Sequence, residues 1–313
     1  EISACLVGSE MCIRDRFIGD KTMTANPVPT TNPLLSFMRQ PKIYIRLPSN
    51  GQYWPEGSLK VSENEEYPVY SMTARDELML KIPDAVMSGQ AVVDVIQNCI
   101  PNIKDAWSIP SIDVDYILIA IRIATYGETM ETPITYGDNE EIVYNVDLRV
   151  VMDHYQNQVF WDPVISVSPD LTIFVRPLSY KNISSNALKA FETQKIMQVV
   201  TDDKTGEEEK LEAFKTSFKK LTDVTIGVIQ SSIYRVDTVN GTTENLKFIK
   251  EFIENVDKEI FNAVQSHLDK LKEINTLKPL IVEVTDEMRE KGFKSETDTV
   301  EVPLVFDPST FFV

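Results

Sequence analysis

The chain has 313 residues, of which 42% are hydrophobic and 25% are charged, a composition typical of a globular protein large enough for a buried core and two domains. Its formal net charge of -17 repels phosphate backbones and anionic membrane surfaces, which argues against nucleic-acid and membrane partners. The longest purely apolar run in the segment 112–124, Ile117 to Ile121, falls far short of the roughly 20 residues of a membrane helix, so we expect a soluble protein.

The first 22 residues resemble a translated sequencing adapter, so the expected start is Met23, and residues 1–22 are set apart as an artefact. Their apolar part is too short and interrupted for a signal peptide. Cys5 and Cys12 lie in this stretch, which leaves Cys99 as the one remaining thiol. A single thiol forms neither an internal disulfide nor a cysteine metal site, which fits a reducing compartment.

Residues 23–41 contain four prolines and little charge, which predicts a proline-rich arm or linker. One apolar cluster interrupts it, formed by Leu34, Leu35, Phe37 and Met38. The arm is either a disordered tail or a segment that docks on a partner through this cluster.

Strand-like and helical patterns follow the arm. Residues 42–47 and 67–72 alternate in the manner of strands around the turn-rich sequence PSNGQYWPEG, which predicts a β-hairpin or small sheet. Thr73, with Asp76 three positions later, predicts a capped helix start, and Pro83 breaks that helix. A second helix is expected from Ser88 through Cys99.

The segment from Ser111 to Gly127 is apolar on nearly every side and predicts a buried central helix with Ser111 as its N-cap. A fully buried strand is the rival interpretation because many of these residues are β-branched. Asp113 and Asp115 stand two positions apart and so point to different sides of a helix. Helix-start electrostatics explains them better than a catalytic carboxylate pair does.

Two strands, residues 130–136 and 142–148, flank an acidic turn and predict a second hairpin. The turn residues 138–141 lack the spacing of a calcium loop, and no cysteine pairs stand near the turn as a zinc knuckle would require. A short helix is expected at 149–158 and a strand at 171–178.

The second half of the sequence is dominated by helical periodicity. Helices are predicted at 184–200, 207–236 and 244–274, and closing strands at 280–284 and 299–306. The apolar end FDPSTFFV is expected to be buried, in this chain or in a neighbour.

These patterns predict an α+β fold, with an N-terminal β-hairpin and a helical core with small β-hairpins, plus a C-terminal amphipathic helical insertion. The expected organisation is an artefact at 1–22, an arm at 23–41, an α+β core at 42–178, a helical region at 179–278 and a C-terminal β-hairpin with an apolar terminus at 279–313.

No pattern of catalytic residues is recognisable. His154 and His267 belong to no triad or ligand pair and are expected at the surface, and nucleotide-binding, nucleophile-elbow and zinc-protease motifs are absent from the sequence. We therefore predict no catalytic residue, cofactor, metal or small-molecule substrate. Three tryptophans flanked by proline or apolar residues suit either core packing or an interface. The candidate interface residues are Leu34, Leu35, Phe37, Met38, Trp54, Trp107, Trp161, Phe311 and Phe312.

Three stretches, PSNGQYWPEG, VYSMTARDELMLKIPDAVMSGQAVVDVIQNCIPNI and SIDVDYILIAIRIATYGE, resemble the baseplate hub and hub-assembly protein family of T-even-type contractile-tailed phages. The resemblance covers about 42–148 and extends more loosely to the closing FDPSTFF. Some relatives carry cysteine pairs in a hairpin, and their absence here argues against zinc.

The resemblance implies a non-enzymatic baseplate hub subunit or hub-assembly factor that contacts other phage baseplate hub proteins. It would be made in the bacterial host cytoplasm and, as a subunit, retained in the virion tail baseplate. Two alternatives remain: a transient assembly chaperone absent from the virion and, less favoured, a tail-associated hydrolase.

Overall fold

The computed structural model describes residues 34, 37–136, 140–201, 206–290, 299–302 and 311–312. Residues 1–38 and 39–313 form two separate compact units. In the first unit, Leu34, Phe37 and Met38 expose most or about half of their side chains. The proposed artefact, Leu35 and most of the arm lie outside the described residues.

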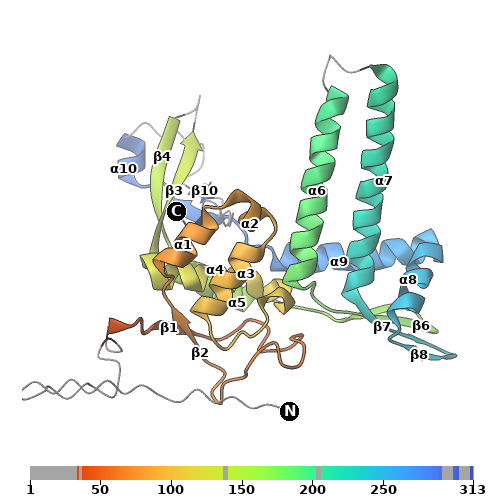
Figure 1. The fold of residues 1–313 in the computed structure, drawn as a ribbon, viewed down its shortest axis with the longest axis horizontal. Helices are drawn as coiled ribbons and strands as arrows, with labels where there is room; N and C mark the ends of the chain where they lie inside the picture. The colour runs from red at the N-terminus through yellow and green to blue at the C-terminus, as the bar shows by residue number, and fades with distance from the viewer. Residues whose placement is uncertain are drawn as a thin grey trace, which may run out of the picture. The chain divides into compact units, whose positions relative to one another are not determined.

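The second unit has the predicted α+β class, with small antiparallel sheets among helices (Figure 1). Its helices are α1 (Ala74–Leu80), α2 (Pro83–Met87), α3 (Gln90–Cys99), the short 3-10 helix η2 (Ala106–Ser108), α4 (Ser111–Tyr126), α5 (Leu148–Gln158), α6 (Tyr180–Thr201), α7 (Glu207–Ser232), α8 (Leu246–Asn255), α9 (Lys258–Asn275) and α10 (Asp286–Glu290). Its strands are β1 (Pro41–Ile45), β2 (Tyr67–Tyr70), β3 (Thr129–Tyr136), β4 (Glu140–Asp147), β5 (Val164–Ser168), β6 (Leu171–Val175), β7 (Ile233–Thr238), β8 (Gly241–Thr243), β9 (Leu280–Glu283) and β10 (Thr299–Val302).

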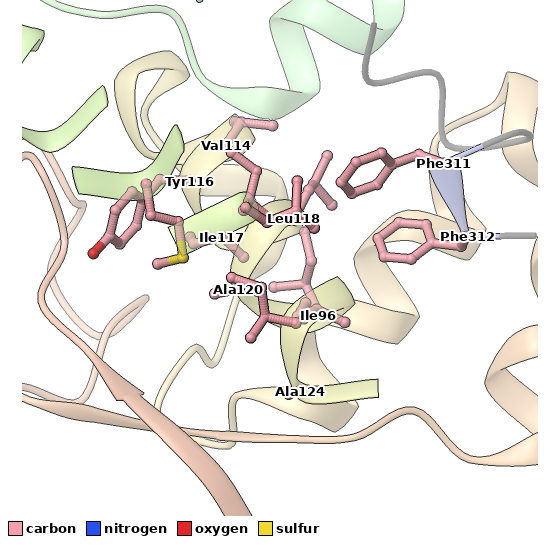
Figure 2. Packing of buried hydrophobic residues seen from close by; sticks show 14 of the residues in the cluster. Ile96, Val114, Tyr116, Ile117, Leu118, Ala120, Ala124, Phe311 and Phe312 are labelled. Carbon is pink, nitrogen blue, oxygen red and sulfur yellow. The ribbon is translucent and has the colours of Figure 1, made fainter. Parts of the chain in front are cut away.

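Helix α4 forms the centre of the first hydrophobic core, and this confirms the predicted buried helix over its strand rival. Eleven of its residues are buried, and they face every direction around its axis. Figure 2 shows Ile117, Leu118 and Ala120 of α4 packed beside Ile96 of α3. The helix begins after Pro110, with Ser111 as its first residue, so the prediction of Ser111 as N-cap is wrong.

The start of α1 confirms the predicted capping box. The Thr73 side chain accepts a hydrogen bond from the Asp76 backbone N–H, and the Asp76 carboxylate accepts one from the Thr73 backbone N–H. Pro83 then stands at the first position of α2, where its missing N–H costs no helical hydrogen bond.

Gly89 precedes α3 with a φ of 80°, a conformation that glycine adopts without steric cost. A Cβ atom at this position would lie 2.5 Å from the Ser184 Oγ of α6. Glycine at position 89 therefore permits close contact between the start of α3 and α6.

Three hairpins agree with the sequence prediction. β1 pairs with β2, β9 pairs with β10, and β3 pairs with β4 over eight residue pairs from Thr129–Asp147 to Tyr136–Glu140. Of the predicted turn, residues 137–139 lie outside the described ranges, whereas Glu140 and Glu141 belong to β4. The predicted strand residues 303–306 also lie outside the described ranges.

A second hydrophobic core lies around the four-stranded sheet β5-β6-β7-β8. Buried residues of the sheet, such as Ile173 and Val236, pack with Ile229 of α7, Ile249 of α8 and Val264 of α9. The sheet combines strands from before and after the predicted boundary at residue 178.

The prediction of a helix through Val236 is wrong in its last turn. Helix α7 ends at Ser232, and Ile233–Thr238 instead pair with β6 as strand β7. Ile233 and Val236 are buried in this sheet, so tertiary pairing overrides the helical periodicity that runs into them. Strand β5 has no counterpart in the prediction.

Long helices account for the rest of the second half. α6 and α7 pair as a helical hairpin, and the amphipathic helical pattern predicted from 244 to 274 forms two helices, α8 and α9, with Val256-Asp257 between them (Figure 1). Across the described residues, no helix has both the length and the apolar character needed to cross a bilayer.

Replacing Ile117 by alanine should lower the free energy of unfolding by about 2–5 kcal/mol, because the side chain is fully buried in the middle of α4 and its loss leaves a cavity. The matched control is Ile281→Ala, since that isoleucine is 71% exposed, and its loss should cost less than about 1 kcal/mol. Urea unfolding of both variants measures the difference. Equal losses would contradict the central position of α4.

Candidate interaction surfaces

No constellation for catalysis or metal binding stands out in the described part of the chain. No group of three or more His, Cys, Asp or Glu side chains there is arranged to hold a metal ion. His154 is exposed as predicted, whereas His267 is partly buried, with its Nε2 3.0 Å from the Asp162 carbonyl oxygen. The surfaces and the polar centres that shape them are therefore the features to examine.

Asp113 links the central helix to the turn between β1 and β2. Its Oδ1 accepts a hydrogen bond from the Ser49 backbone N–H at 2.9 Å, and its Oδ2 accepts from the Ser49 hydroxyl at 2.5 Å. The indole Nε1 of Trp54 donates to the same Oδ2 at 2.8 Å. The carboxylate thus holds the PSNGQYW turn, and Asp113 also lies in the first turn of α4, as the sequence predicts.

Burial of Asp113 raises the pKa of its carboxyl group to about 6, although the hydrogen bonds from Ser49 and Trp54 favour the ionised form and oppose the shift. Its side chain is fully buried. Trp54, a predicted interface candidate, is half-buried and contributes to this internal network.

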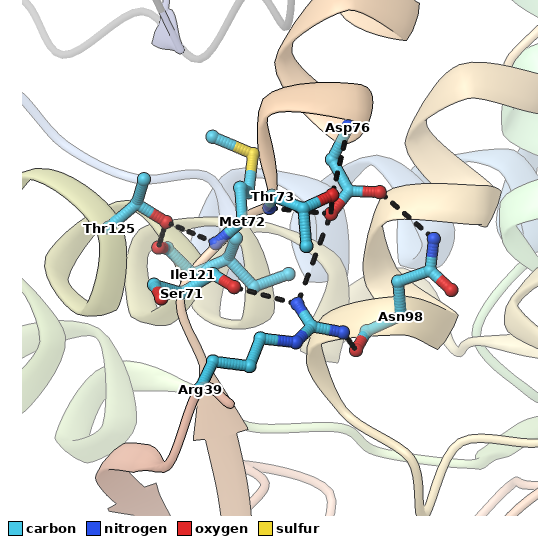
Figure 3. A network of polar contacts seen from close by, with 8 residues as sticks. All are labelled: Arg39, Ser71, Met72, Thr73, Asp76, Asn98, Ile121 and Thr125. Atoms are coloured by element: carbon cyan, nitrogen blue, oxygen red, sulfur yellow. Dashed lines mark hydrogen bonds and ion pairs between the residues drawn. The ribbon is translucent and has the colours of Figure 1, made fainter. Parts of the chain in front are cut away.

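A second polar network lies around the start of α1 (Figure 3). The Arg39 guanidinium donates to the carbonyl oxygens of Ser71 at 2.7 Å and Asn98 at 2.5 Å, and the Asn98 amide donates to Asp76. The backbone N–H of Met72 donates to the Thr125 hydroxyl at the end of α4. Arg39 is the first residue of the second unit, and its hydrogen bonds attach that residue to the C-terminal ends of β2 and α3.

The aromatic residues at the C-terminal end pack inside the chain. Phe311 and Phe312 are 4% and 3% exposed and point toward α4 in Figure 2. Arg122 donates to the Phe311 carbonyl oxygen, and the Tyr126 hydroxyl donates to the Phe312 carbonyl oxygen at 2.8 Å. These two interface candidates are core residues here, and their contact with a partner stays a prediction.

The other two tryptophans are also partly buried. Trp107 packs against Tyr180 of α6, with ring centroids 5.9 Å apart, and Trp161 donates its indole N–H to the Val175 carbonyl oxygen. Both are therefore engaged in packing within the chain, and a partner contact for either also stays a prediction.

One side of α7 carries an exposed apolar surface, which we call the α7 stripe. It consists of Leu211, Phe214, Phe218 and Leu221, which are between 46% and 65% exposed. Their spacing of three, four and three residues places them on one side of the helix, and the rings of Phe214 and Phe218 stack with centroids 6.5 Å apart. The sequence prediction missed this stripe because amphipathic periodicity does not reveal whether a neighbouring helix covers the apolar side.

A groove runs between α1 and α2 on one wall and α6 on the other, with α4 as its floor. Its volume is about 880 Å³, and most of its lining is apolar, including Val86, Met87, Leu188 and Phe191. Asp115 projects from the floor and is the one carboxylate among the described residues that line the groove. We call this feature the α4 groove.

Asp115 also lines a second cavity, of about 330 Å³, on the side toward α9. The side chain keeps partial access to solvent, and its surroundings raise the pKa of its carboxyl group to about 6 through desolvation alone. Asp113 and Asp115 thus point to different environments, as their spacing predicts, and do not form a catalytic pair.

A profile of the T4 bacteriophage base plate protein family matches residues 41–283, which is most of the chain. The chain belongs to this family. It is therefore a phage baseplate protein, and the predicted resemblance is confirmed. The match extends beyond residue 148 through the four-stranded sheet, the α6–α7 hairpin and α9. No curated protein matches the chain, and no solved structure does.

The Asp113→Asn variant should lose about 1–3 kcal/mol of unfolding free energy. All the partners of this carboxylate are donors from Ser49 and Trp54, so the amide NH₂ group of asparagine would face a buried donor and leave it without an acceptor. Asp223→Asn, at an exposed position on α7, is the matched control and should be neutral. Chemical denaturation at pH 7 measures both. A neutral Asp113→Asn would show that the turn does not depend on this carboxylate.

The pKa of Asp115 predicts a pH dependence of stability. Its folded-state pKa of about 6 exceeds the usual carboxyl value, so the folded protein retains a proton that the unfolded chain has already lost between about pH 4 and pH 6. The unfolding free energy of the natural chain relative to Asp115→Asn should therefore fall by about 2 kcal/mol as the pH rises through this window. Parallel pH profiles of the two proteins would contradict the burial of this carboxylate.

Proposed function

We propose that this baseplate protein is a subunit or assembly factor of the baseplate hub and that it acts by protein–protein contacts rather than by catalysis. The observation that carries the proposal is the α7 stripe, a set of large apolar side chains on a helix that projects from the sheet and remains exposed. Exposed apolar side chains that gather on one helix side typically mark a contact surface.

The charges beside the α7 stripe indicate the chemistry of the partner. Lys210 and Lys215 flank it, and Lys219 lies on the same exposed stretch, whereas Glu208 and Glu212 lie beside its first residue, Leu211. An amphipathic helix with acidic residues beside its apolar face would bury the phenylalanines and pair with these lysines. We propose such a helix, from another baseplate protein, as the occupant.

Retention in the virion separates the two versions of this function. A hub subunit should be found by mass spectrometry of purified phage particles, in a fixed ratio to other baseplate proteins. A transient assembly factor should be present in baseplate precursors from infected cells and absent from finished particles. Absence from both preparations would contradict either role.

Introducing charge into the α7 stripe should reduce incorporation of the protein into baseplate precursors by at least tenfold, since Phe214→Glu and Phe218→Glu each place a carboxylate where apolar contact is expected. Thr216→Glu is the control, because Thr216 is exposed on the same helix but points about 160–200° away from both phenylalanines. Incorporation is measured by sedimentation of precursors from infected cells that supply the variant. The stripe would be excluded as the contact if Thr216→Glu also reduced incorporation, or if both phenylalanine variants were incorporated normally.

A further inference from the structure

The α4 groove has the form of a site for a helix or extended segment of another protein. Its walls are the α1–α2 pair and α6, and its floor is the N-terminal half of α4. Met87, Leu188 and Phe191 line it and are each between 37% and 41% exposed. The groove is therefore open, largely apolar, and bounded by elements that the first core holds in place.

The carboxylate of Asp115 is the exceptional feature of this floor. No hydrogen bond or ion pair joins it to any side chain or backbone group in the described ranges of the chain. Lys81 lines the same groove but forms no ion pair with it, and Asp269 and Lys272 line the adjoining cavity without pairing with it either. Tyr155 faces it from α5 and donates its hydroxyl proton to the Ile112 carbonyl oxygen instead.

An unpaired carboxylate on an apolar floor becomes costly once a ligand covers it, unless a cation of that ligand meets it. Removal from water destabilises the ionised form, and burial under a purely apolar ligand would increase that penalty. A lysine or arginine can pack its aliphatic stem against the apolar walls of the groove and pair its charged end with the Asp115 carboxylate on the floor. Charge complementarity thus determines which ligand fits the groove.

We propose that the α4 groove binds an amphipathic segment of a second baseplate protein, which inserts one lysine or arginine to pair with Asp115. This partner chemistry differs from the acidic helix proposed for the α7 stripe. The apolar cluster of the chain's own arm does not fit the groove as well, because residues 23–38 contain no charged side chain to pair with Asp115. The inference rests on the proposed role in baseplate contacts.

Site-directed photocrosslinking identifies the occupant. The full chain carries benzoylphenylalanine in place of Phe191, and it is produced together with the other baseplate proteins of the same phage. We expect a crosslink to a segment with apolar residues at three- to four-residue spacing and a lysine or arginine among them. Benzoylphenylalanine in place of Phe248, which is 59% exposed on α8, is the control and should not label that segment.

The affinity of the purified pair then tests Asp115. Asp115→Asn should weaken binding at least tenfold, because it leaves the partner's cation unpaired in the groove, and Asp223→Asn should leave binding within twofold. Asp115→Lys combined with an acidic replacement of the partner's cation should restore most of the lost affinity. Ala187→Lys, at an exposed position in the groove, should also block binding without disturbing the core, because it places a like charge beside the partner's cation.

Three results would overturn the proposal: a crosslink to residues 23–38 or to a second copy of this chain, a crosslinked segment without a cation, or normal binding by Asp115→Asn and Ala187→Lys. The α7 stripe variants distinguish these failures from failure of the proposed function. If the groove variants bind normally while Phe218→Glu does not, only the groove inference is wrong. If neither surface yields a baseplate partner, the proposed function is wrong as well.

Discussion

The first core depends on the burial of α4 from every side. A helix with apolar residues around its whole circumference is stable in water only when other elements cover most of it, and here α3, α5, β1, β2 and the base of α6 pack against it. The constraint also explains Asp113. A carboxylate in such a helix must find donors, and the turn between β1 and β2 supplies three from Ser49 and Trp54.

The sequence predicted the elements whose signals are local. The capping box of Thr73 and Asp76, the break at Pro83 and the β3–β4 hairpin depend on residues close together in the chain, and all are present. The end of α7 depends instead on the pairing of Ile233 with Val175, far away in sequence. No local pattern distinguishes such a strand from one more helical turn.

The candidate surfaces were less predictable for the same reason. Apolar periodicity in α7 shows that one side is hydrophobic, but only the folded chain shows that Phe214 and Phe218 remain uncovered. The two aspartates of α4 look alike in sequence, whereas Asp113 meets three donors and Asp115 meets none among the residues that the structure describes. The aromatic terminus is expected to be buried in this chain or in a neighbour, and the structure buries both phenylalanines against α4 within this chain.

That aromatic pair has a consequence for biosynthesis. Arg122 and Tyr126 bind the carbonyl oxygens of residues that lie 189 and 186 positions later in the chain. The cover over this part of α4 therefore cannot form until residue 312 has left the ribosome, and contacts so distant in sequence form slowly. During translation the nascent helix presents uncovered apolar surface at that end until residues 311 and 312 pack against it.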